Sequence, residues 1–255
     1  MKRTAIIIAS ALLPLAGHAE EKPLWEIQGR LGEKASPRID AWLKELFIAR
    51  GGIVAPVSGQ TMFRIAGFEN GKTPESDWLA EVRGLSDMKS IMEKVEAGSK
   101  PDGTGRFLVE REGVRYLVWQ EGDSVLRLAG PPESAGISVA PAVPMQEGAC
   151  LSGWVDLLRL NRNIESKVLK TATSLSFSVA GAGEGVTVDL DAGLVNREAA
   201  EIGKALAEDL TARLAVDGGR PTVTTDDNKL KVRFGLSASL LDKIVGEMKA
   251  AIEKR

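Results

Sequence analysis

Residues 174–191 read SLSFSVAGAGEGVTVDLD, and this stretch decides the fold. Its first part alternates strictly, with Leu175, Phe177 and Val179 on one side and three serines on the other. Successive side chains of a strand point to opposite faces, so the alternation predicts a strand that is buried on one face. The glycines within residues 181–185 join it to a second alternating strand, which favours a hairpin turn over a phosphate-binding loop. We therefore expect an antiparallel sheet with helices packed on one face, an α+β fold.

The hairpin belongs to a longer series of predicted elements. In order, these are a strand near Cys150–Val155, a helix from Asp156, strands at Ser174–Ala180 and Val186–Asp191, a helix from Asn196, strands at Thr222–Thr225 and Leu230–Gly235, and a helix after Ser237. The helix from Asn196 carries large apolar residues at helical spacing: Ile202, Leu206, Leu210 and Leu214. Asp, Asn and Ser are good N-cap residues, so each helix has a defined start.

The preceding half of the chain shows a matching order. Its predicted elements are a helix from Ser36 and Pro37, strands at Thr61–Ala66 and Trp78–Arg83, a helix after Ser86, and a meander of Arg106–Arg111, Val114–Gln120 and Ser124–Leu128. On element order alone, we interpret the chain as two similar halves that form a diverged repeat. Each half is predicted to be an antiparallel sheet with helices packed on one face.

A proline-rich stretch separates the two halves. Residues 130–148 contain Pro131, Pro132, Pro141 and Pro144. Proline lacks a backbone donor and favours extended structure, so the stretch is typical of a linker. The sequence thus predicts two α+β domains, at residues 24–129 and 149–255.

The N-terminus has the three parts of a secretory signal peptide. Lys2 and Arg3 form the positive region, and residues 4–15 form the apolar region. In Gly17-His18-Ala19, the small residues Gly17 and Ala19 stand at the two positions that a signal peptidase recognises. The apolar run is shorter than a membrane-spanning helix. We therefore expect cleavage after about residue 19, a mature chain without an integral membrane segment, and a periplasmic or secreted location.

Composition excludes several classes of function. The one histidine of the 255 residues, His18, lies in the signal peptide, so the mature chain lacks an imidazole for Ser-His-Asp catalysis, Cys-His catalysis or zinc binding. The one cysteine, Cys150, has no partner for an internal disulfide, and its apolar neighbours indicate a buried thiol. The net charge is −2 and basic residues are scattered, which argues against nucleic-acid binding. We expect no metal site and no cofactor.

Four residues are candidates for chemistry or binding. Asp189 and Asp191 lie two apart on a predicted strand, so both carboxylates share a face, and paired carboxylates can act as acid and base. The same pattern is also typical of a solvated strand face. Trp78 and Trp119 lie in predicted strands, where exposed tryptophans bind sugars or anchor partners and buried ones pack in the core.

These observations leave three hypotheses about function. The first is an exported, non-catalytic binding protein whose partner is a protein or small ligand outside the cytoplasm. The second is a carboxylate-dependent hydrolase, either an aspartic-type protease or a glycosidase, since this route needs no histidine. The third is a carrier of an apolar ligand. An acidic pair in a cleft would favour the hydrolase, and a deep apolar cavity would favour the carrier. An exposed apolar patch would favour the partner-binding protein.

Overall fold

A computed structural model describes residues 21–31, 57–69, 77–111, 113–160, 171–214, 221–243 and 246. The signal peptide predicted at residues 1–19 and the helix predicted from Ser36 lie outside the described residues. So do the later parts of the helices predicted from Asp156 and after Ser237.

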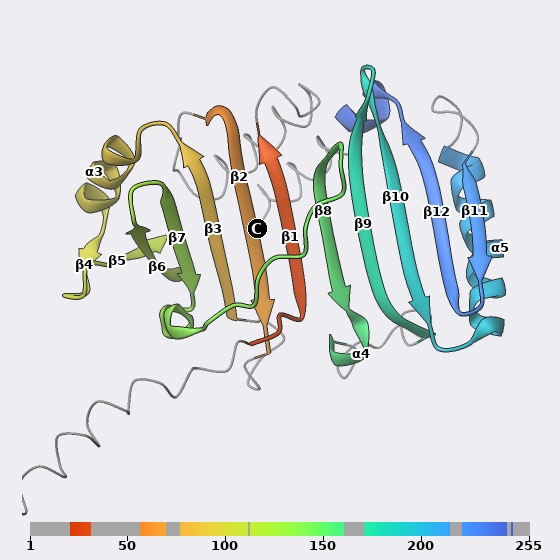
Figure 1. Ribbon diagram of the computed structural model, residues 1–255, viewed down its shortest axis with the longest axis horizontal. Coiled ribbons are helices and arrows are strands. Elements are labelled where there is room, and N and C mark those ends of the chain that lie inside the picture. The colour runs from red at the N-terminus through yellow and green to blue at the C-terminus, as the bar shows by residue number, and fades with distance from the viewer. Residues whose placement is uncertain are drawn as a thin grey trace, which may run out of the picture.

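The described strands form one antiparallel sheet (Figure 1). In chain order, the elements are β1 (Trp25–Leu31), β2 (Val57–Phe68), β3 (Asp77–Leu85), α3 (Met88–Gly98), β4 (Lys100–Pro101), β5 (Phe107–Arg111), β6 (Val114–Glu121), β7 (Val125–Gly130), the 3-10 helix η2 (Pro132–Gly136), β8 (Ala149–Asp156), α4 (Leu157–Leu160), β9 (Ala172–Ala182), β10 (Gly185–Leu194), α5 (Arg197–Leu214), β11 (Thr222–Asp226) and β12 (Lys229–Leu236). The order across the sheet is β11-β12-β10-β9-β8-β1-β2-β3-β7-β6-β5-β4. The chain is a mixed α+β protein.

The sheet continues without interruption across the proline-rich stretch. Strand β1 pairs with β2 on one side and with β8 on the other, and Glu26 of β1 faces Trp154 of β8. Residues 130–148 thus connect β7 to β8, which lie in the same sheet. In each half, the last strand pairs with the third strand of that half: β7 pairs with β3, and β12 pairs with β10. The two halves differ, however, in the number of described strands that they contribute to the sheet. The internal repeat and the two-domain division stay predictions.

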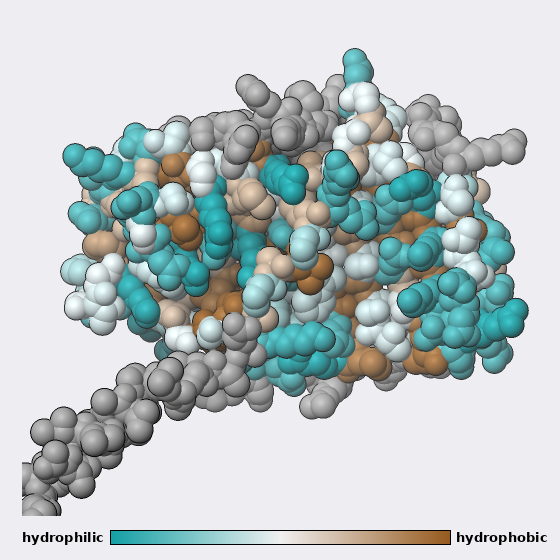
Figure 2. Space-filling view, viewed as in Figure 1, coloured by the Kyte–Doolittle hydropathy of each residue, from teal (hydrophilic) through white to brown (hydrophobic). Residues whose placement is uncertain are grey.

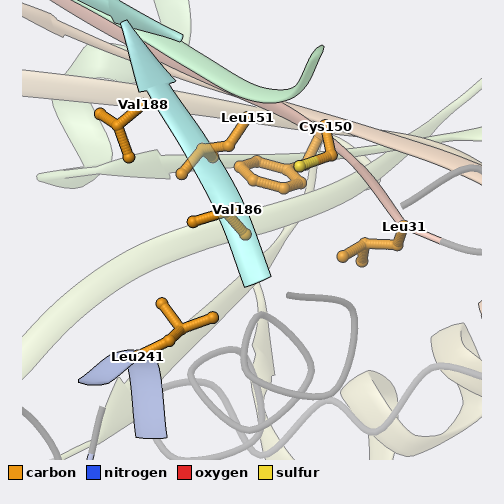
Figure 3. Packing of buried hydrophobic residues seen from close by; sticks show 7 residues of the cluster. Leu31, Cys150, Leu151, Val186, Val188 and Leu241 are labelled. Atoms are coloured by element: carbon orange, nitrogen blue, oxygen red, sulfur yellow. The ribbon is translucent and has the colours of Figure 1, made fainter. Parts of the chain in front are cut away.

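One face of the sheet, here called the inner face, carries three of the four buried apolar clusters and all the described α-helices that pack on the sheet. The fourth cluster, Ala66, Phe68, Leu79 and Ala129, lies on the opposite face. The apolar side chains of the inner face form an unbroken row from β6 to β11: Val118, Leu128, Ala80, Ile65, Ile27, Gly153, Phe177, Leu190, Val232 and Val223. Helix α3 covers one end of this row, and α4 and α5 cover the other. Buried Cys150 lies in the cluster between them, where Leu241 points toward Val186 (Figure 3).

Aromatic rings cover glycines on the neighbouring strands of this inner face. Phe63 of β2 lies directly across from Gly29 of β1, and a Cβ added to Gly29 would fall 2.3 Å from the Phe63 ring. The same arrangement recurs in three further cross-strand pairs: Trp25 over Gly67, Trp78 over Gly130, and Phe177 over Gly153. Each ring fills the space that a side chain would take, which lets the strands approach and still leaves a continuous apolar layer.

The N-cap predicted at Asn196 is present. Its side-chain oxygen Oδ1 accepts a hydrogen bond from the backbone N–H of Ala199 at 2.8 Å and so satisfies one unpaired donor of the first turn of α5. Asn196→Ala removes this acceptor, and we expect the free energy of unfolding to fall by about 1 kcal/mol. Chemical denaturation monitored by circular dichroism measures the change. Asn196→Asp keeps an acceptor and should stay close to the wild type; an equal loss in both variants would contradict the capping role.

Candidate functional site

The opposite face, here called the outer face, carries a continuous row of polar side chains. Its members lie directly across from one another on successive strands: Arg127, Glu81, Arg64, Gln28, Ser152, Ser178, Asp189, Arg233 and Thr222. We call this the outer polar row. Figure 2 views this face, on which hydrophilic side chains gather over both ends of the sheet.

Residues 137–148, here called the strap, cross the middle of the outer polar row on their way to β8 (Figure 1). Three members of the outer polar row bind the strap at positions 140, 143 and 146, that is, at every third residue. Arg64 donates to the carbonyl of Ala140 at 2.7 Å, and Gln28 donates to the carbonyl of Val143. Ser178 donates to the side-chain oxygen of Gln146 at 3.0 Å. A three-residue repeat matches an extended polyproline-type chain, which explains why prolines suit this segment.

An ion pair lies beneath the strap. Arg64 and Glu26 approach to 2.7 Å, and the Glu26 side chain is only 2% exposed. The other carboxylate oxygen of Glu26, Oε1, is buried without a hydrogen-bond partner, as is the indole nitrogen of its cross-strand neighbour Trp154. Since a buried carboxylate needs compensation, Arg64 both neutralises Glu26 and holds the strap.

A polar groove of about 390 Å³ opens where the strap meets the sheet. Asp189 and Arg233 line it and form a two-point ion pair, with Nε to Oδ1 at 2.6 Å and Nη2 to Oδ2 at 3.0 Å. These hydrogen bonds to Asp189 raise the pKa of the Arg233 guanidinium. Ser178 and Gln146 form the adjoining wall. The groove therefore brings the Asp189–Arg233 ion pair together with the hydrogen-bonding groups of Ser178 and Gln146.

Asp189 and Asp191 lie on the outer face, as their spacing predicts. They do not face one another: Asp189 pairs with Arg233, and Asp191 lies across from Ser176 and Lys231. Because Arg233 binds both oxygens of Asp189, the two aspartates form no proton-sharing pair in this structure. A catalytic role for either residue stays a prediction.

Trp78 and Trp119 lie on opposite faces. Trp78 is on the inner face, where it covers Gly130 and has its ring centroid 6.2 Å from that of Tyr116. Trp119 is on the outer face, across from Arg127, and the Arg106 guanidinium lies 4.9 Å above its ring. Seven strand spacings separate Trp119 from Asp189, or roughly 30 Å. The structure therefore does not bring the candidate tryptophans and aspartates together, and binding by either tryptophan stays a prediction.

Helix α5 presents three of its large apolar side chains to solvent. Ile202 is 58% exposed, Leu206 48% and Leu210 59%, and we call these three residues the α5 stripe. The helix packs on the sheet through small residues instead: Ala200 is fully buried, and a Cβ added to Gly203 would lie 3.2 Å from Cδ2 of Leu230. The sequence predicts the stripe but not its direction. The available signal was the run of small residues on the adjacent side of the helix: Ala199, Ala200, Gly203 and Ala207.

Nowhere in the described part of the chain do three or more His, Cys, Asp or Glu side chains come together as metal ligands. Among the described residues, no helix has both the length and the apolar character to span a bilayer.

The fold resembles that of TP0453. Crystal form I of TP0453 superposes with a TM-score of 0.55 at 9% sequence identity, over 89% of this chain and 95% of the other. Crystal form III gives a TM-score of 0.53 at 11% identity, over 89% of this chain and 96% of TP0453. No protein-family model matches the chain, and no curated protein sequence does. At such low identity the similarity to TP0453 concerns the fold alone.

Proposed function

We propose that this protein is an exported, non-catalytic binding protein that uses the α5 stripe to dock a protein partner. The exposure of Ile202, Leu206 and Leu210 carries the proposal. Full burial of a Leu or Ile side chain is worth about 1.5–3 kcal/mol, and folding leaves about half of that surface in water here. Contiguous apolar residues on a surface mark interaction sites.

The packing of α5 supports this proposal because the stripe contributes little to the core. Ala200 and Gly203 allow the helix to approach β12 closely, and Leu194, Leu230 and Val232 fill the buried cluster below it. The large apolar residues of α5 are therefore free for a partner. The remaining hypotheses have less support: Asp189 is bound by Arg233, and the groove beside it is polar, unlike the site of an apolar-ligand carrier.

Site-specific crosslinking tests the docking surface. A photoreactive amino acid at position 206, introduced into the full chain in its native envelope, should form one defined adduct with another protein. Leu206→Gln, combined with a crosslinker at position 210, should abolish that adduct, because the polar amide removes the central apolar contact. Position 114 is the matched control, since Val114 is also exposed but lies at the start of β6.

The folding of the variant is checked separately. Gln is a good helix former, and Leu206 is half exposed, so Leu206→Gln should change the free energy of unfolding by less than about 1 kcal/mol. Adducts that form equally from positions 206 and 114, or that persist in Leu206→Gln, would contradict the proposal.

A further inference from the structure

We infer that the outer face of the sheet holds a binding site for a Pro-x-x-Pro segment of a partner protein, and that the strap occupies this site in the free chain. The strap carries the pattern at residues 141–144, as Pro141-Ala142-Val143-Pro144. The site lies on the face opposite to α5, so it is separate from the docking surface proposed above.

The strap is bound as a peptide ligand is bound, by side chains that reach its backbone carbonyls. Arg64 donates to the carbonyl of Ala140 at 2.7 Å, and Gln28 donates to the carbonyl of Val143. Each of these two carbonyls immediately precedes a proline. An extended polyproline-type chain has three residues per turn, so carbonyls three residues apart point to the same side. Arg64 and Gln28 lie directly across from one another on β2 and β1, and they therefore bind carbonyls at the Pro-x-x-Pro spacing.

The middle of the strap can leave the sheet while both of its ends stay in place. Ile137 and Val139 pack against the apolar cluster of the outer face, and the strap ends at the buried start of β8. Between these ends, residues 141–144 are exposed, and Val143 is 56% exposed. Release of residues 140–146 therefore breaks the hydrogen bonds to the strap but removes little apolar surface from the core. Segments with few buried apolar contacts open locally more readily than core strands do.

The closed strap also buries polar atoms that it does not satisfy. Among the described residues, Glu26 Oε1 and Arg64 Nε are buried without a hydrogen-bond partner. A buried polar atom without a partner raises the free energy of the state that buries it. Both atoms belong to the ion pair beneath the strap, so their burial opposes closure and favours exchange of the strap for another peptide.

The contacts select a proline-containing peptide over other occupants. Prolines hold a peptide in the extended form before it binds, so binding costs less conformational entropy than for a flexible peptide. Glu26 neutralises Arg64, and Asp189 neutralises Arg233 at the far end of the strap. The site therefore offers no excess positive charge, which an anionic lipid surface or a nucleic acid would require.

A variant with a weakened strap tests the site in the full mature chain. Pro141→Gly/Pro144→Gly loosens the strap but keeps Arg64, Gln28 and Ser178. The probe is the acetylated and amidated peptide Ala-Pro-Ala-Val-Pro-Met-Gln, which has the sequence of residues 140–146. In the wild type, the tethered strap competes with the probe at an effective concentration in roughly the millimolar range. We therefore expect the variant to bind the probe at least about tenfold more tightly than the wild type does in NMR titrations.

Two controls examine the recognition itself. A peptide with glycine in place of both prolines should bind the strap variant at least about tenfold more weakly than the probe does. Gln28→Met, added to the strap variant, removes the donor to the second carbonyl and should weaken binding of the probe at least about threefold. Gln120→Met, the same change at an exposed glutamine of β6, should leave binding unchanged.

Crosslinking to the wild-type chain gives a result that does not depend on the folding of the strap variant. A probe with a photoreactive residue in place of its central alanine, at about 1 mM, should form an adduct with β1, β2 or β8. Excess unlabelled probe should block this adduct, and the glycine peptide should not. Absence of the adduct, an adduct elsewhere, or equal binding of the proline and glycine peptides would overturn the inference. A wild-type dimer that Pro141→Gly/Pro144→Gly dissociates would also overturn it, because the strap of a second copy would then be the occupant.

Discussion

Gly29→Val should lower the free energy of unfolding by about 3–5 kcal/mol, the amount expected for loss of a large buried aromatic side chain from a core. A Cβ at position 29 would lie 2.3 Å from the Phe63 ring and 3.2 Å from the carbonyl oxygen of Cys150. Phe63 is only 4% exposed and packs in the central cluster of the inner face, so the ring has no free space to enter. The valine therefore expels the ring or separates β1 from its neighbours. Urea denaturation monitored by circular dichroism measures the loss.

A double-mutant cycle gives the sharper result. In Gly29→Val/Phe63→Ala, the valine occupies the space that the ring has vacated. The loss of unfolding free energy in the double variant should therefore be smaller than the sum of the losses in the two single variants. Gly98→Ala is the control, because an added Cβ there has no atom within 4 Å, and its effect should stay below about 1 kcal/mol. Additive losses in the cycle would show that the Phe63 ring does not fill the Gly29 site.

Arg64→Met should lower the free energy of unfolding by a comparable amount, about 3–5 kcal/mol, because it leaves the Glu26 carboxylate buried without its counter-charge. The same change removes the hydrogen bond to Ala140, so the strap should also become more sensitive to protease. Glu26→Leu/Arg64→Met removes both charges and should recover much of the lost stability. Denaturation curves and limited proteolysis read out the two effects.

An exposed ion pair provides the comparison. Arg83, whose side chain is 62% exposed, pairs with Glu81 on the same outer face. Arg83→Met should lower the free energy of unfolding by less than about 1 kcal/mol, since Arg127 still pairs with Glu81 at 3.2 Å and Arg83 itself is exposed. If Arg64→Met proved as mild as Arg83→Met, the strap would not bury the Glu26 charge as the structure indicates.

Local patterns predicted much of the fold. The alternation of residues 174–191 gave the hairpin of β9 and β10, and Asn196 gave the first turn of α5, because each signal depends on residues close in the chain. Cys150 is buried, as its apolar neighbours indicated. Strand β1 was missed. Glu26, Gln28 and Arg30 make its outer side polar, but Gly29 interrupts the apolar side, and the Phe63 ring that completes it lies 34 residues away.

The candidate site was less predictable because it depends on register and direction. Asp189 meets Arg233 only through the pairing of β10 with β12. The role of residues 130–148 depends on Arg64 and Gln28, which are distant in sequence and bind the strap across the outer face. For α5, the hydrophobic period identified the stripe. Whether the stripe or the side with small residues packs on the sheet depends on how closely the helix approaches Leu230.

The position of β1 at the centre of the sheet has a consequence for biosynthesis. Trp25 must pair with Val155, so the first strand of the described residues gains its second neighbour only after 130 further residues have been made. Until β8 arrives, one edge of β1 exposes unpaired backbone groups, which can pair with another chain. Such distant pairing slows folding and prolongs the aggregation-prone state. The newly made chain should therefore depend on chaperones until residues 149–156 have emerged.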